Sequence, residues 1–438
     1  MIQEQVILLL LDLAKGTQIR NYYNFYKSTL GWSKEELAVY RTKKLKKLVN
    51  HAYQNVPYYK SKFDDIGFTP DDIQRVDDIQ KLPILERTDI QNNTDQLKSK
   101  NYKNKVFAGS SSGTTGIPIK YYQDIDSYSA GLAAIYLLRS MSGWRVGMRG
   151  IHIWGNIASV EKWKRIPSRL KRILLNQKYI SSILLNDVNI VPEVIRTIQK
   201  FKPVFLDGYT NAIYEIAIFL KNHHLSIPSI KYIFTTAENL EPHQKKLIEE
   251  YLAPVQDDYG FSEINSIASM LIKSDKYVIF EPHVIVECFQ SDDKKMKDVI
   301  VTDLDNYYMP FIRYRVGDLI DDVYTTDKNE PTKYSYFKNI YGRSSDVIIL
   351  ENGEKIYPVN IFGGTLYRKF TNITQHKVCW NGKKLKFIFS SNGDLNKNEL
   401  RRLIQASLKE YRIDFHIEYT DRILPSKNGK YTYFEIEK

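Results

Sequence analysis

Hydrophobic positions recur at helical spacing through the first hundred residues of the chain. Tyrosine and leucine repeat every three or four residues there, with breaks at VPYY (56–59), FTPDDI (68–73) and LPIL (82–85). Residues three and four apart share one face of a helix, so this spacing predicts amphipathic helices. We expect residues 1–100 to be mostly helical.

From about residue 103 the pattern changes to short apolar runs that alternate with helical periodicity. The predicted strands are 149–155, 202–208, 230–238 and 254–260, and the predicted helices are 211–224 and 241–253. Strand–helix–strand alternation is typical of a mainly parallel sheet with helices on its faces. The pattern therefore predicts an α/β core over about residues 101–274.

After about residue 275 the helical periodicity fades. The segments YVIFEPHVIVECF (277–289), KDVIVTDLD (297–305) and PFIRYRVGDLIDDV (310–323) predict antiparallel strands, in a small sheet or barrel over 275–342. GRSSD (342–346) then provides the flexible, polar chemistry of a linker. We expect a domain junction there, with a large domain over 1–342 and a small α+β domain over 343–438.

The amino-acid composition indicates the class of protein and its cellular compartment. The chain has 438 residues, 43% of them hydrophobic, which suits a soluble protein of two or three folding units. The two cysteines, Cys288 and Cys379, cannot build a disulfide framework or a cysteine metal cluster, and they favour a reducing cytoplasm.

No apolar run reaches the length of a membrane span, so no transmembrane segment is expected. The apolar run Val6 to Leu11 follows Gln3, Glu4 and Gln5 instead of the basic residues of a signal peptide. We interpret it as part of a buried first helix, with shallow contact to a membrane surface as the alternative.

The formal net charge of +12 could indicate a nucleic-acid partner, but the basic residues are spread along the whole chain. The densest run, RTKKLKKL (41–48), has leucines at helical spacing and resembles the solvated face of an amphipathic helix. We expect no nucleic-acid partner. The same positive field suits small anionic substrates such as nucleotides.

The most conspicuous polar cluster is SSSGTTGIP (110–118). Gly113 and Gly116 are too close for a Walker A loop and no lysine follows Gly116, so the segment is not a P-loop. Its glycines and hydroxyls could still form a backbone nest for phosphate oxygens. An ordinary polar turn is the alternative when the segment is considered alone.

Further motifs follow the loop in a fixed order. They are SSGTTGIP (111–118), TTAENL (235–240), DDYGFSE (257–263), YRVGD (314–318), GRSSDVI (342–348) and PSKNGK (425–430). This series resembles the adenylate-forming enzymes, which include acyl-CoA ligases, luciferases and the adenylation domains of peptide synthetases. The resemblance implies a large adenylation domain and a small mobile C-terminal lid, with a hinge near 344–346.

The resemblance also implies a site for ATP or AMP. Its residues would be Ser111, Ser112, Gly113, Thr114, Thr115, Gly116, Ala237, Glu238, Asp258, Tyr259, Gly260, Ser262, Asp318, Arg343 and Lys430. Catalytic roles would fall to Thr114, Glu263 and Lys430.

Physical chemistry supports several of these roles. Tyr259 offers an aromatic face to adenine. Glu263 suits Mg²⁺, which takes one or two carboxylates together with phosphate oxygens. Asp318 can accept hydrogen bonds from both ribose hydroxyls, and Arg343 would contact the ribose or a phosphate. Lys430 would stabilise the charge that develops when a carboxylate attacks the α-phosphate.

Two further segments narrow the resemblance to one branch of the family. Residues 48–90 and LDGYTNAIYEIA (206–217) are similar to phenylacetate-CoA ligases and to CapK-type proteins of capsule and O-antigen gene clusters. Ile119 replaces a lysine that many relatives carry, and this loss is a feature of the phenylacetate-CoA ligase branch. Ser345 replaces the usual hinge aspartate, which leaves the hinge assignment open.

The resemblance implies that His152, Trp154, Tyr209 and Ala237 contact the acyl substrate, although buried aromatic and histidine residues also serve as ordinary core. The expected activity is an ATP-dependent carboxylate ligase with ATP and Mg²⁺ as cofactors. The acceptor of the acyl group could be an amine of a polysaccharide precursor, CoA or a carrier protein. A catalytically inactive nucleotide-binding scaffold is the alternative.

Overall fold

The computed structural model describes residues 2–111, 118–155, 173, 175–187, 189–291, 295–326, 332–362, 365–426 and 429–437. The first hundred residues form helices, as the pattern predicted. They are α1 (Ile2–Lys15), α2 (Ile19–Thr29), α3 (Lys34–Asn55), α4 (Pro57–Asp65), η1 (Pro70–Asp72), η2 (Val76–Lys81) and α5 (Arg87–Asn93). Ser33 begins α3 with a capping box, and the fixed φ of Pro57 suits the first turn of α4.

The centre of the molecule is an eight-stranded sheet of order β13-β9-β8-β7-β6-β5-β3-β4 among the described residues. Its parallel strands are β3 (Gly150–Ile153), β4 (Gln177–Ile180), β5 (Phe205–Tyr209), β6 (Tyr232–Thr236) and β7 (Val255–Tyr259). The segments between them are η3 (Ser182–Asn186), α9 (Val191–Phe201), α10 (Thr210–Asn222) and α11 (Pro242–Tyr251). The predicted α/β core is therefore confirmed.

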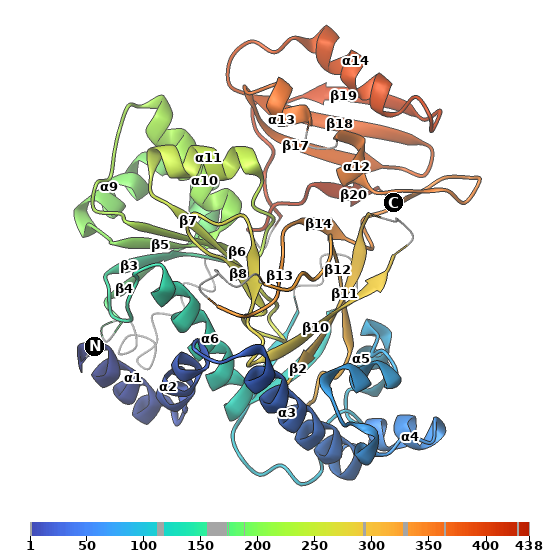
Figure 1. Ribbon diagram of the computed structural model, residues 1–438. Coiled ribbons are helices and arrows are strands. Elements are labelled where there is room, and N and C mark those ends of the chain that lie inside the picture. The colour runs from blue at the N-terminus through green and yellow to red at the C-terminus, as the bar shows by residue number, and fades with distance from the viewer. Residues whose placement is uncertain are drawn as a thin grey trace.

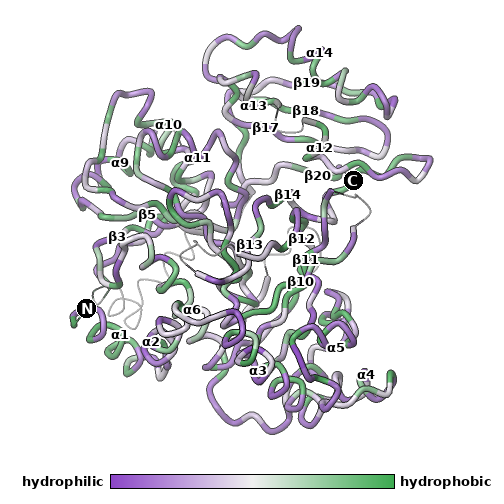
Figure 2. Tube along the Cα trace, in the orientation of Figure 1, coloured by the Kyte–Doolittle hydropathy of each residue, from purple (hydrophilic) through white to green (hydrophobic). Residues whose placement is uncertain are grey.

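Helices cover both faces of this sheet, because alternate residues of a strand point to opposite sides. Leu206 and Ile233 pack with α9, α10 and α11 on one face. Phe205 and Phe234 pack on the other face with α1, α2 and α6 (Ile125–Met141). Figure 1 shows this arrangement, and Figure 2 shows hydrophobic residues along β5 and β10 while the outer loops are largely hydrophilic.

The large sheet continues in three antiparallel strands beyond β7. These are β8 (Ala268–Met270), β9 (Tyr277–Ile279) and β13 (Tyr336–Phe337). Residues 277–279 thus join the large sheet and not the small β-rich region in which the sequence placed them. Short connections lead from β7 to β8 and from β8 to β9, which favours antiparallel pairing, whereas β13 reaches the edge of the sheet only after β10, β11 and β12.

The predicted small β-rich region is a four-stranded antiparallel sheet of order β10-β11-β12-β14. Its strands are β10 (Val284–Gln290), β11 (Lys297–Asp303), β12 (Tyr314–Ile320) and β14 (Ile340–Arg343). A separate pair, β1 (Val106–Ser110) and β2 (Lys120–Asp124), flanks the glycine-rich loop 112–117, which lies outside the described residues.

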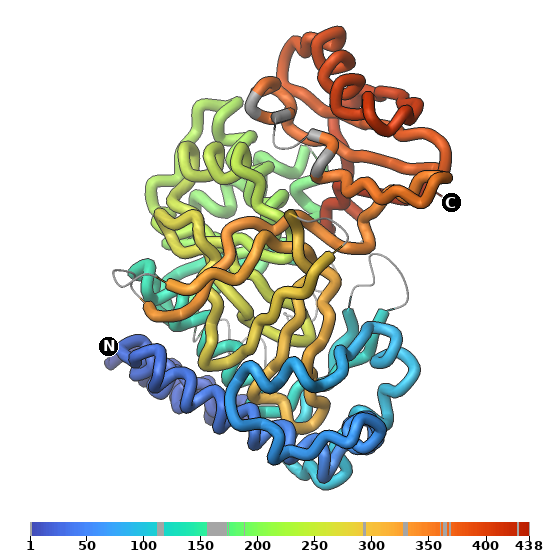
Figure 3. Tube along the Cα trace, turned by 45° about the vertical axis from the view of Figure 1, so that its right-hand side comes forward, coloured from blue at the N-terminus to red at the C-terminus, as the bar shows by residue number. Residues whose placement is uncertain are grey.

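The C-terminal region has mixed α and β structure and a hydrophobic core of its own, which includes Phe387, Leu400 and Phe434. Its elements are β15 (Ile348–Ile349), β16 (Lys355–Ile356), α12 (Pro358–Phe362), α13 (Thr365–Lys369), β17 (Ile373–Trp380), β18 (Lys384–Ser391), α14 (Lys397–Ser407), β19 (Asp414–Tyr419) and β20 (Phe434–Ile436). It lies at the end of the molecule opposite the N-terminal helices (Figure 3).

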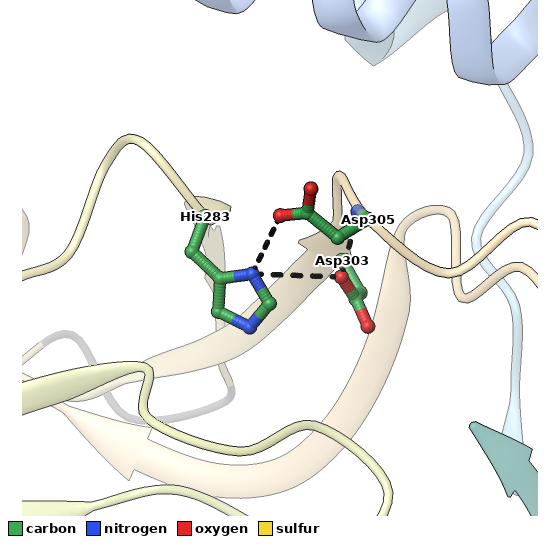
Figure 4. A group of neighbouring side chains, drawn as sticks. All are labelled: His283, Asp303 and Asp305. Carbon is green, nitrogen blue, oxygen red and sulfur yellow. Dashed lines mark hydrogen bonds and ion pairs between the residues drawn. The ribbon is translucent and has the colours of Figure 1, made fainter. Parts of the chain in front are cut away.

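A buried ionic cluster ties the N-terminal helices to the β-rich region. His283 Nδ1 lies 2.8 Å from Asp305 Oδ2 and 3.8 Å from Asp303 Oδ1 (Figure 4), and its Nε2 lies 3.1 Å from the carbonyl of Asn265. A carboxylate and a carbonyl can only accept hydrogen bonds, so both ring nitrogens donate and the imidazole is charged. Burial lowers the pKa of His283, but the two carboxylates outweigh burial and raise it.

Among the described residues, these three side chains have ligand atoms close enough together to hold a metal ion. However, the Lys44 ammonium of α3 contacts Asp305, and the hydroxyls of Tyr26 and Ser127 donate to Asp305 and Asp303. A protein cation thus already neutralises this cluster, and we interpret it as a structural brace.

In the described part of the chain, no helix is both long enough and apolar enough to cross a membrane.

Candidate active site

One cavity of about 820 Å³ lies beside the last residues of β5, β6 and β7 and extends to β12, β14 and the C-terminal region. The sequence-predicted site residues that line it are Ser111, His152, Trp154, Ala237, Glu238, Asp258, Tyr259, Gly260, Ser262, Glu263, Asp318, Arg343 and Lys430. Ser112, Gly113, Thr114, Thr115 and Gly116 lie outside the described residues.

Three of these residues meet at one wall of the cavity. Tyr259, the last residue of β7, donates its hydroxyl to Asp318 Oδ2 at 3.1 Å. Asp318 of β12 pairs in register with Arg343 of β14, whose Nε lies 3.8 Å from Asp318 Oδ1. Burial raises the pKa of Asp318, and Arg343 opposes that shift. A desolvated carboxylate and a guanidinium therefore face the same space.

The turn after β6 carries Ala237 and Glu238. Ala237 has a φ of +69°, a left-handed conformation that a residue with a Cβ rarely adopts. Glu238 Oε2 accepts hydrogen bonds from the amide and the side chain of Asn211, at 2.9 and 3.0 Å. Its Oε1 accepts from the backbone N–H of Tyr431 at 2.6 Å. Burial raises the pKa of Glu238, which these hydrogen bonds oppose.

Asp258, next to Tyr259, is committed to other protein groups. Its Oδ2 accepts from Arg139 Nε at 2.8 Å, and its Oδ1 accepts from Ser269 at 2.5 Å. Arg139 also donates to both oxygens of Asp207, whose Oδ2 lies 2.8 Å from His152 Nδ1. The Asp258 side chain therefore acts mainly in this buried network, and the network fixes the orientation of the His152 ring.

Glu263 follows a tight turn at Gly260. A Cβ on Gly260 would lie 2.8 Å from the Ser266 nitrogen, so this position requires glycine. Glu263 is buried in the cavity wall, where burial raises its pKa, and the hydroxyl of Tyr314 lies 3.5 Å from its Oε1. One buried carboxylate in a cavity that also suits phosphates fits the donor set of Mg²⁺, which completes its shell with phosphate and water oxygens.

Lys430 enters the cavity from the C-terminal region. Its Nζ lies 5.7 Å from the ring centroid of Tyr209, and within the described ranges no carboxylate forms an ion pair with it. Burial lowers the pKa of Lys430 below its ordinary value, and the Glu238 carboxylate opposes that shift without reversing it. Gly429 has a φ of +77°, and a Cβ there would lie 2.5 Å from Ser182 Oγ, so Gly429 packs tightly on η3.

Aromatic and apolar side chains also line the cavity. Tyr209 does not line the cavity itself, but its ring lies 4.5 Å from that of Trp154, which does. One face of α6 contributes Tyr128, Leu132 and Tyr136 to the same space. A mainly apolar group could bind there.

Arg87, the first residue of α5, is a cavity residue that the sequence motifs did not indicate. Its NH2 lies 3.0 Å from Ser111 Oγ, and the residue lines the cavity on the side of Glu263. A cation from the N-terminal helices thus lies beside Ser111, at the end of the described part of this motif. Only the apolar spacing around Arg87 was informative in the sequence, and this spacing does not indicate where its side chain points.

Comparison with known proteins agrees with this geometry. The chain is 28% identical over 369 residues to protein CapK of Staphylococcus aureus. This alignment covers 81% of this chain and 79% of CapK. It is 27% identical over 368 residues to the phenylacetate-coenzyme A ligase of Escherichia coli, and this alignment covers 78% of this chain and 79% of the ligase. No family model matches the chain.

The fold is that of a solved 2-hydroxyisobutyryl-CoA ligase. In its postadenylation state, that structure gives a TM-score of 0.71 at 16% identity, covering 91% of this chain and 89% of the ligase. The same ligase in its thioesterification state gives 0.58. The arrangement of this chain is therefore more similar to the postadenylation state.

These findings confirm the class that the motifs predicted, the adenylate-forming ligases that release AMP. Within that class, the curated proteins to which the chain is similar are CapK and phenylacetate-CoA ligases.

Proposed function

We propose that the protein joins a carboxylic acid to ATP, forming an acyl-adenylate and pyrophosphate, and then transfers the acyl group to a nucleophile. The observation that carries this proposal is the convergence of Glu263, Asp318, Arg343 and Lys430 on one cavity. These residues come from four separate segments of the chain and include two desolvated carboxylates and two cations.

In the first step a carboxylate oxygen of the acid bonds to the α-phosphorus of ATP, and the bond from phosphorus to the pyrophosphate oxygen breaks. Asp318 would hold the ribose hydroxyls, and Tyr259 would support the adenine. Lys430 would stabilise negative charge on the phosphoryl oxygens as the pyrophosphate leaves. Arg87 and Ser111 would contact the phosphates from the N-terminal side. Bound Mg²⁺ at Glu263 would neutralise phosphate charge.

In the second step a thiol or an amine attacks the acyl carbonyl and loses its proton, and AMP leaves with the electrons of the broken acyl–oxygen bond. CoA is the acceptor that the names of the phenylacetate-coenzyme A ligases support, and a carrier-protein thiol and an amine of a polysaccharide precursor are the alternatives that we propose. We place the reaction in the reducing cytoplasm, which is supported by the free thiols of Cys288 and Cys379.

Product analysis by mass spectrometry tests the proposal. The protein is incubated with ATP, Mg²⁺ and a panel of carboxylic acids that begins with phenylacetate, in parallel with CoA and with amines. We expect AMP and pyrophosphate with at least one acid, and one acceptor class should yield a new acyl conjugate. Binding of ATP without turnover of any acid would instead support the inactive scaffold.

A further inference from the structure

A carboxylate that does not line the cavity joins the C-terminal region to the large sheet region. Glu215 of α10 accepts a hydrogen bond from Gln375 Nε2 of β17 at 3.0 Å and one from Arg422 NH2 at 2.9 Å. Figure 1 shows the C-terminal strands beside α10 and α11. Each oxygen of one carboxylate thus binds a different segment of the C-terminal region.

Arg422 makes further contacts with the large sheet region. Its NH1 donates to the carbonyl of Asn186 at 3.0 Å, and its NH2 donates to the carbonyl of Leu185 at 2.6 Å. The side chains of Arg422 and Glu215 are only 19% and 21% exposed. Removal of either partner would leave a poorly hydrated charge, which costs more than the loss of an exposed ion pair.

The same surface also seats the residue that precedes Lys430. Leu185 and Asn186 end η3, and Ser182 at the start of η3 packs against Gly429. Two short stretches of the C-terminal region, one at Arg422 and one at Gly429, therefore dock on a single short helix. Their position determines where the Lys430 side chain enters the cavity.

A second carboxylate completes the contact on the other side of Lys430. Glu238 accepts the N–H of Tyr431 at 2.6 Å, while Asn211 holds its other oxygen. Contacts on both sides of Lys430 thus come from the large sheet region, and a movement that withdraws the lysine would break them together.

We propose that Glu215 and Arg422 are positioning residues that dock the C-terminal region so that Lys430 reaches the reacting phosphate. This inference rests on the proposed function. Because the contacts stabilise only the arrangement with Lys430 in the cavity, they raise its population relative to arrangements in which the lysine is withdrawn. They should therefore affect adenylation and leave acyl transfer from a preformed adenylate unchanged.

Half-reaction kinetics test the inference. Glu215→Ala and Arg422→Ala are each expected to lower pyrophosphate exchange by at least about tenfold, the loss of a charged hydrogen-bond network. Transfer from the synthetic adenylate of the same acid should stay within about twofold of wild type, because it does not use docked Lys430. The double variant should be no worse than Arg422→Ala. Equal losses in both half-reactions, or additive effects, would overturn the inference.

Hydrogen exchange gives a readout that needs no substrate. In the full-length protein without ligand, Arg422→Ala should speed deuterium uptake at the Tyr431 amide, because the bond to Glu238 then opens more often. Lys369→Ala is the matched control, since its pair with Glu399 at 2.9 Å lies entirely within the C-terminal region. Unchanged uptake in Arg422→Ala would overturn the inference. If the wild type activates no acid, the proposed function is refuted. Deuterium uptake at the Tyr431 amide would still show whether Arg422 docks the C-terminal region.

Discussion

Two partly buried lysines of this protein, Lys44 and Lys430, have opposite surroundings. The ammonium of Lys44 contacts Asp305, which also binds His283 and Tyr26. The ammonium of Lys430 lies over the ring of Tyr209, and no carboxylate in the described part of the chain pairs with it. Lys44 neutralises charge within the protein, whereas the charge of Lys430 is available to a ligand bound in the cavity.

Asp305, the carboxylate that Lys44 contacts, differs in the same way from the carboxylates of the cavity. Burial would raise the pKa of Asp305, but Lys44 and His283 outweigh it and lower the pKa. Burial raises the pKa of Glu263 and Asp318, and the nearby cations do not reverse the shift. A cluster that satisfies its own charges supports the fold, whereas one that holds desolvated, undercompensated charges is suited to bind and react.

A large expected effect separates these two clusters by function. Glu263→Gln should lower pyrophosphate exchange at least about 100-fold, because the metal–phosphate contact loses its carboxylate. Its free energy of unfolding should be unchanged or higher, since a buried charge is removed. Asp305→Asn should show the reverse pattern. Exchange assays and urea unfolding of both variants check this, and a stability loss in Glu263→Gln would contradict it.

The second effect concerns the brace. Lys44→Met should lower the free energy of unfolding by about 3 kcal/mol, because Asp305 loses its cation in a buried site. Lys46→Met is the control on the same helix, since its pair with Asp71 is exposed, and its effect should stay below about 1 kcal/mol. Chemical denaturation gives both values. Similar losses in the two variants would show that the brace adds nothing specific.

The smallest effect is a pH dependence at the contact between α11 and the C-terminal region. The ring of His243 stacks on that of Tyr367 at 3.5 Å, and Tyr367 hydrogen-bonds His376 Nδ1 at 2.6 Å. Burial lowers the pKa of His243 to about 3, with a further contribution from His376, and burial lowers the pKa of His376 to about 4.

The unfolded chain binds protons at these histidines below about pH 6.5, where the folded chain does not, so stability should fall as the pH drops from about 6.5 toward 4. His243→Phe keeps the stacked ring and removes one of the two groups. We expect a smaller difference in unfolding free energy between pH 7 and pH 5 than in wild type. An unchanged difference would contradict this assignment.

The sequence predicted most of the parallel core and the motifs that surround the cavity. Tyr259 and Asp318 could be located because they lie in motifs, DDYGFSE and YRVGD, that resemble those of adenylate-forming enzymes. Arg87 and the pair of Glu215 with Arg422 could not, since they depend on contacts between residues far apart in the chain with no periodic pattern. The register that carries β9 into the large sheet is equally a tertiary property.

The most direct test compares pyrophosphate exchange of the wild type, Lys430→Ala and Lys384→Ala with one acid that the wild type activates. Lys384 pairs with Asp414 on the surface of the C-terminal region and serves as the control. We predict that Lys430→Ala lowers exchange by about 1,000-fold with unchanged thermal stability, while Lys384→Ala matches the wild type. Exchange by Lys430→Ala within about threefold of the wild type would contradict the proposed role of Lys430 in adenylation.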